Sequence, residues 1–246
     1  MKKTFLLFAL MIMFAVVGCK KDESTTDPGN TNQNSSTTPT PTDFGGATPT
    51  NVLAVVRTST TYVGVTVELG LAAATFGNPP QDKGVVKVTS KGTDYTLTKQ
   101  SNNSYVFNPE ALSPQGIGFN SGSTEVTFSA ANYSLINTKV FVPGKITVTA
   151  PAAETSVPRA SNLTITWTVS GAGSNNAVMV IDKDGKSIFK QNLGTATSAS
   201  VTSAELQTLS SGSAIVYAIS YNYILSNNNE AVLIGETVAF NTVNLQ

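Results

Sequence analysis

The chain has no histidine and one cysteine, and only 12% of its residues are charged. Without histidine it has no Ser-His-Asp or Cys-His nucleophile system, no imidazole metal ligand and no side chain that ordinarily titrates near neutral pH. The acidic residues are scattered singly, so no carboxylate pair is set up for glycosidase chemistry. Four of them are expected to face solvent: Glu68, Glu125, Glu205 and Glu236. We therefore expect no enzymatic activity, no metal and no cofactor.

Basic charge is also scarce. The formal net charge is zero, and arginine occurs only at positions 57 and 159. A nucleic-acid-binding protein needs a cluster of cations to neutralise the phosphate backbone. The composition therefore excludes nucleic acid as a partner.

The first residues have the pattern of a secretory signal. Lys2 and Lys3 precede an apolar run from Phe5 to Val17. A membrane-spanning helix needs about 20 apolar residues, so this run is too short to cross a bilayer but fits the apolar region of a signal peptide.

The end of this run resembles the lipobox of bacterial lipoproteins. Val16 and Val17 are followed by the small residue Gly18 and then by Cys19. The resemblance implies that residues 1–18 are a signal peptide, that Cys19 is acylated, and that the lipid is the protein's contact with the membrane. Because Cys19 is the only cysteine, no disulfide partner competes for it. The alternative is an ordinary signal peptide with an incidental cysteine.

Charged residues follow the cysteine directly: Lys20, Lys21, Asp22 and Glu23. They resemble the export tag of lipoproteins that some Gram-negative bacteria display on their surface. The resemblance implies an outer-membrane lipoprotein exposed at the cell surface. Two alternatives are a charged start of a linker and a protein that stays on the periplasmic face.

Residues 19–50 read as a lipidated cysteine and a disordered linker. From Ser24 to Thr50 the chain is rich in Ser, Thr, Asn and Pro, and Phe44 is its one large apolar residue. Such a segment cannot bury enough surface to offset the entropy lost on ordering. We expect a flexible spacer that lifts the folded part away from the membrane.

From residue 51 onward, short runs rich in Val, Ile, Thr and aromatic residues alternate with Gly, Asn, Ser and Pro clusters, which is typical of all-β sandwiches. The expected strands before Pro143 are Val52–Arg57, Thr61–Leu69, Val85–Ser90, Tyr95–Lys99, Ser104–Phe107, Glu125–Ser129 and Thr138–Val142. Lys91 and Gly92 form a hairpin turn, and the alanine-rich Leu71–Phe76 is the likeliest helix. With a boundary at Pro143-Gly144, the prediction is two tandem β-sandwich domains, residues 51–143 and 144–246.

The second half carries a family resemblance. Leu163, Ile165, Trp167 and Val169 alternate with threonines, which is similar to the second strand of fibronectin type III and related immunoglobulin-like domains. The resemblance implies a β-sandwich with Trp167 in its core. The stretch Ala204–Ile215 resembles the leucine-containing turn that leads into the sixth strand of these domains. Ile215 stands where the family has its corner tyrosine, so the hydrogen bond of that tyrosine is not expected.

Two groups of residues are candidates for ligand sites. Asp182 to Gly185 opens like a calcium loop, but Leu193 stands where an EF-hand needs a bidentate glutamate, so a type I′ hairpin turn at Asp184-Gly185 is expected instead. Among the aromatics, Tyr217 and Tyr221 share an apolar strand face with Ile215 and Ile219 and should point into the core. Tyr223, near the end of that strand, is the candidate for ligand stacking.

Together these features favour a lipid-anchored, surface-exposed protein that binds or adheres without catalysis. Two alternatives are a glycan-binding component of a polysaccharide-uptake system and a purely structural spacer of the envelope. The partner would be a protein or a glycan.

Overall fold

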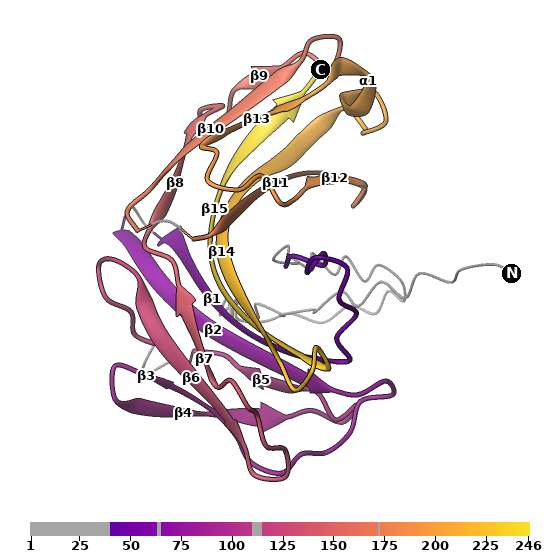
Figure 1. The fold of residues 1–246 in the computed structure, drawn as a ribbon. Coiled ribbons are helices and arrows are strands. Elements are labelled where there is room, and N and C mark those ends of the chain that lie inside the picture. The colour runs from indigo at the N-terminus through magenta and orange to yellow at the C-terminus, as the bar shows by residue number, and fades with distance from the viewer. Residues whose placement is uncertain (1–39, 63–64, 110–114, 172) are drawn as a thin grey trace, which may run out of the picture. The chain divides into compact units, whose positions relative to one another are not determined.

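Alternating apolar and polar residues build strands through most of the folded part. The computed structural model describes residues 40–246 apart from 63–64, 110–114 and 172. Within these ranges Pro41–Gln246 forms one compact unit, made of strands and the short helix α1 (Ser203–Leu206) (Figure 1). No described helix has the length and apolar character needed to span a membrane.

The strands before Pro143 enclose the first core. They are β1 (Asn51–Tyr62), β2 (Val65–Phe76), β3 (Val86–Ser90), β4 (Thr93–Lys99), β5 (Tyr105–Phe107), β6 (Thr124–Ala130) and β7 (Lys139–Val142). Each contains or overlaps a run predicted from the sequence. The sheet order β1-β2-β5-β4-β3-β6-β7 lets Leu53 and Phe76 pack in one core with Val86 and Phe128.

The strands after Gly144 enclose a second core. They are β8 (Ile146–Ala150), β9 (Ser156–Val157), β10 (Leu163–Val169), β11 (Asn175–Asp182), β12 (Ser187–Lys190), β13 (Ser198–Val201), β14 (Gly212–Ser226) and β15 (Ala231–Leu245). One sheet has the order β13-β10-β8, and the other side is β12-β11-β14-β15. This is the strand arrangement of an immunoglobulin-like sandwich of the fibronectin type III kind. Trp167 is 2% exposed in its core, so its predicted place is confirmed.

The two cores share one sheet. β14 and β15 pair along their whole lengths, and β1 pairs in parallel with β15 from Asn51 beside Ala231 to Thr58 beside Val238. The long strands therefore belong to both halves of the unit (Figure 1). The expected all-β class is confirmed, but two separate tandem domains are not, because strands of both halves join in one large sheet.

Both faces of the shared sheet are apolar. This is typical of strands that pair in parallel and are covered on both sides. Ala214, Val216 and Ala218 of β14 face the Trp167 core, whereas the alternating residues Tyr217 and Tyr221 lie on the opposite face. Both tyrosines are buried as expected. The expectation that their face fills the sandwich core was wrong, because the small residues between them do so.

Glu236 also departs from the sequence-based expectation. It was expected to face solvent, but it is fully buried. It lies in register between Val56 of β1 and Tyr221 of β14. Its central position in the shared sheet removes it from water, which the local sequence did not indicate.

Two local predictions need correction. The alanine-rich Leu71–Phe76 is not a helix but the end of β2, where Ala72 and Ala74 are buried in the first core. The Asp184-Gly185 turn is a hairpin turn but not of type I′, which needs positive φ at two residues. Here Gly185 alone has positive φ (81°), whereas Lys91 and Gly92 both do (52° and 77°). The hairpin turn predicted at Lys91-Gly92 is confirmed.

Other contacts hold the loop that the corner tyrosine holds in fibronectin type III domains. Ile215 is in the place of that tyrosine, and the guanidinium of Arg159 instead reaches the loop before β14, with Nη1 donating to the carbonyl of Leu209 at 2.7 Å. Asp182 accepts a further bond at 2.7 Å from the backbone N–H of Ser210. These two contacts fix the loop without a phenolic hydroxyl.

The polar segment expected to be disordered up to Thr50 is ordered near its end. Phe44 is 6% exposed and packs against Ala54, Val232 and Ile234. The expectation of disorder is thus wrong for the stretch around Phe44, because this one aromatic side chain packs against apolar residues of the shared sheet.

Candidate functional site

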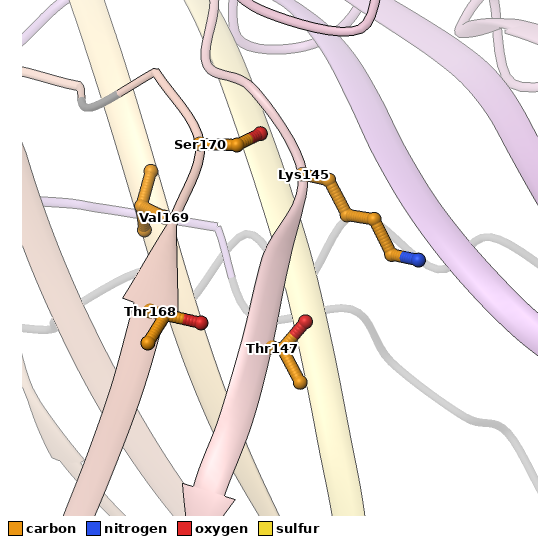
Figure 2. Close-up of a pocket in the computed structure, with 5 residues that line it drawn as sticks. All are labelled: Lys145, Thr147, Thr168, Val169 and Ser170. Atoms are coloured by element: carbon orange, nitrogen blue, oxygen red, sulfur yellow. The ribbon is translucent and has the colours of Figure 1, made fainter.

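A surface hollow of about 270 Å³ opens where β8 and β10 run side by side. It is lined by Lys145, Thr147, Thr168, Val169 and Ser170 (Figure 2). In the antiparallel register Thr147 lies opposite Thr168 and Ile146 opposite Val169. Because side chains alternate along a strand, the same pattern that sends Ile146 and Trp167 into the core sends these hydroxyl groups outward.

The hollow continues into a hydroxyl-bearing surface. The outward side chains of β8, β10 and β13 are all Ser or Thr, and we call this set the hydroxyl face: Thr147, Thr149, Thr164, Thr166, Thr168, Ser198 and Ser200. Neighbouring strands lie about 4.8 Å apart, and successive outward residues of one strand about 6.6 Å apart. All are exposed except Thr166, which is half-buried and shares a 2.8 Å hydrogen bond with Thr149.

Positive charge beside this face comes from Lys145. Its side chain is exposed and also lines a much smaller hollow shared with Arg57 and Glu68. Arg57 is committed within the fold: Nε and Nη2 donate to Glu68 Oε2 at 2.9 and 2.6 Å, and Nη1 donates to the carbonyl of Gly122 at 3.2 Å. Its guanidinium also lies 5.5 Å from the centre of the Phe119 ring. The ammonium group of Lys145 is therefore the cation that can meet a ligand.

These groups suit recognition by hydrogen bonds. Threonine and serine hydroxyls both donate and accept, and an ammonium group offers three donors. Such a surface can bind ligands rich in hydroxyl or carboxylate oxygens. Among the described residues, no group of three potential metal ligands comes together.

The residues that the sequence predicts as sites lie elsewhere. Cys19 and the charged residues Lys20, Lys21, Asp22 and Glu23 lie outside the described residues. Tyr223 is half-buried, and the ring of Phe44 meets it edge to face with the ring centres 5.3 Å apart. Tyr223 thus contacts Phe44 in this structure, and its role in ligand stacking stays a prediction.

The loop from Asp182 to Gly185, which opens like a calcium loop, is fixed by hydrogen bonds from its own backbone. Asp182 is 6% exposed, and its Oδ1 accepts from the backbone N–H groups of Asp184 and Lys186, both at 2.9 Å. Burial pushes the pKa of Asp182 upward, but the bonds from Ser210, Lys186 and Asp184 outweigh it, so the pKa is lowered overall. The carboxylate holds the turn, as a structural residue would.

Sequence reasoning did not single out the hydroxyl face or Lys145. The signal was present, because threonine occupies every second position of Thr147–Thr149 and of Thr164–Thr168. Such alternation by itself indicates only that the threonines lie on the face of the strand opposite the apolar residues. Nothing local shows that β8 pairs with β10, which is what brings the two threonine series together.

Fold and site define an all-β protein with an immunoglobulin-like half. No family model and no curated protein matches the sequence. Among solved structures, the fibronectin(III)-like modules of CbhA from Clostridium thermocellum share 14% identity over 71% of this chain and 83% of that chain, with a TM-score of 0.25.

Two adhesin structures have similarly low scores. A tetra-tandem repeat from the extending region of a large adhesion protein is 16% identical over 78% of this chain and 50% of that chain, with a TM-score of 0.22. A Ca²⁺-stabilised adhesin with which an Antarctic bacterium binds ice is 13% identical over 81% and 50%, with a TM-score of 0.24. This chain spans half the length of each. Scores this low do not define a shared fold, so the class stated above rests on strand order.

Proposed function

We propose that the protein is a lipid-anchored, surface-displayed binding or adhesion protein that works without catalysis. The observation that carries the binding role is the hydroxyl face with Lys145 at its margin. It is an exposed array of hydrogen-bonding groups beside the ammonium group of Lys145. Hydroxyl groups at regular spacing on a rigid sheet can meet a repetitive polar ligand without rearrangement, which lowers the entropy lost on binding.

The anchor follows from the sequence. Cleavage before Cys19 would leave its thiol to carry the lipid, and more than one acyl chain makes membrane attachment stable. Lys20, Lys21, Asp22 and Glu23 would direct the protein to the outer face, and the polar segment that follows would act as a tether. Residues 51–143 and 144–246 would be the two parts of the displayed unit.

A glycan is the ligand class that this surface favours. Sugar hydroxyls pair readily with Ser and Thr hydroxyls, and Lys145 would add affinity for an acidic sugar. This is the role of a glycan-binding component in a polysaccharide-uptake system. A protein ligand would require apolar anchor residues. The hydroxyl face consists of Ser and Thr side chains and does not offer them.

The test is a glycan and protein ligand screen with the chain from residue 19, made with Cys19→Ser so that it is free of lipid. The critical variant is Lys145→Gln with Thr168→Val, and the matched control is Lys186→Gln, an exposed lysine on the β11–β12 turn. We expect the first variant to lose at least tenfold in affinity and the control to keep it. Equal binding by all three proteins would remove the hydroxyl face from the binding role, and an absence of any ligand would favour the envelope spacer.

A further inference from the structure

The end of the polar segment forms a small hairpin-like turn on the sheet. Phe44 and Ala47 pair across it, and Gly45 and Gly46 have positive φ values of 69° and 87°. Asp43 Oδ1 accepts from the N–H of Gly45 at 3.1 Å. Two consecutive glycines make this reversal possible without strain, because they lack a Cβ. We call Asp43–Ala47 the aromatic turn.

The aromatic turn is held by one deep apolar contact. Phe44 is 6% exposed, whereas Asp43, Gly45 and Gly46 are exposed. Its ring packs in one cluster with Ala54, Tyr223, Leu225, Val232 and Ile234 of the shared sheet, and we call the place that the ring occupies the Phe44 groove. The phenol of Tyr223 meets the Phe44 ring edge to face, a favoured geometry for aromatic pairs.

Polar contacts at the margin fix the direction of the turn. Gln191 Oε1 accepts from the N–H of Thr42 at 3.0 Å, and Asn192 Nδ2 donates to Asp43 Oδ2 at 2.7 Å. Asn192 Oδ1 in turn accepts from the Tyr221 hydroxyl at 2.8 Å, which connects the clamp to β14. The bonds that Gln191 and Asn192 make to Thr42 and Asp43 are exposed.

These contacts describe a docked element and not a continuation of the sheet. The aromatic turn contributes no strand, and it is attached by the buried Phe44 ring, the partly buried Ala47 and a few exposed hydrogen bonds. Segments of this kind open locally at a much lower free energy than core strands. Its neighbour on the other side is the tether inferred from the sequence, through which any pull from the membrane would arrive.

We propose that the Phe44 groove is a docking site for the chain's own aromatic turn, which acts as a releasable latch between tether and sheet. Release would free residues 42–49, about 26 Å of extended chain, and would open an apolar, tyrosine-lined groove. The groove takes an aromatic residue that is preceded by aspartate and followed by two glycines. The idea is independent of the ligand proposed for the hydroxyl face.

The test uses the chain from residue 19 with Cys19→Ser and a fluorescent peptide of residues 40–48. In the Phe44→Ala variant the groove is open, so fluorescence anisotropy should show peptide binding. The unaltered latch competes, so binding should be at least tenfold weaker with Phe44 present. A control peptide with Phe44→Ala should bind at least tenfold more weakly than the natural peptide.

Gln191→Ala provides a second variant that keeps Phe44 and weakens only the polar clamp. It should speed hydrogen exchange at the Thr42 and Gly45 amides and leave Trp167 fluorescence unchanged. Equal peptide binding with and without Phe44, or unchanged exchange in Gln191→Ala, would overturn the latch. A dimer of the chain that depends on Phe44 would also overturn it, because the groove would then hold the turn of a second copy.

Discussion

Removing Trp167 should unfold both halves of the structure together. The side chain is 2% exposed in the second core, and truncation of a buried Trp to Ala typically costs about 3–5 kcal/mol. That is a large part of the whole stability of an ordinary domain. Leu233 of β15 belongs to the first core, and the pairing of β1 with β15 joins the strands around both cores in one sheet. Loss of packing in one core should therefore destabilise the other.

The assay is thermal unfolding followed by far-UV circular dichroism and calorimetry. Wild type should melt in one cooperative transition, and Trp167→Ala should lower that same transition. Phe128→Ala, which empties the first core at a fully buried position, should do likewise. Trp167→Phe is the control: the indole N–H has no hydrogen-bond partner among the described residues, so a smaller ring should cost less than alanine. Two transitions, of which each variant shifts only one, would refute the shared-sheet reasoning.

Three further results are expected. The Lys190 ammonium, the foremost cause, and the bonds from Thr202 lower the pKa of Glu205 from its ordinary 4.5 to about 2, so this stabilisation is present above pH 4.5 and lost as pH falls toward 2. The Tm difference between wild type and Glu205→Gln should therefore be largest near neutral pH and shrink as the pH falls from 4.5 toward 2, and a constant difference would contradict this. Gly235→Ala should lower the Tm, because its Cβ would lie 2.6 Å from the Phe141 carbonyl oxygen, whereas Gly118→Ala has only the Tyr95 hydroxyl at 3.6 Å and should have little effect. Trp167, the one tryptophan, should emit at short wavelength and resist quenching by iodide; ready quenching would place it at the surface.

Much of the secondary structure could be predicted because it follows from the local alternation of apolar and polar residues. The Leu163–Val169 strand and the burial of Trp167 follow from a period of two with apolar residues on one side. The Lys91-Gly92 turn follows from the freedom of glycine at positive φ. The alanines of Leu71–Phe76 misled because alanine favours helices in isolation, and burial between β1 and β5 overrode that preference.

Long-range pairing could not be predicted in the same way. The parallel contact of Asn51 with Ala231 joins the two ends of the folded unit, and no local pattern records it. Because this pairing was unknown, the sheet was expected to have one apolar face, and both Glu236 and the face of Tyr217 were misplaced. The hydroxyl face was missed for the same reason, since it exists only where β8 meets β10.

The most direct test of the central claim is protease treatment of intact cells that produce wild type or Cys19→Ser. We expect wild type to label with a palmitate analogue and to be cut by added protease within the tether, which releases the folded unit into the medium. Cys19→Ser should neither label nor remain with the membrane. Wild type that is protected in intact cells would contradict surface display, and unchanged labelling and membrane attachment of Cys19→Ser would contradict the lipid anchor.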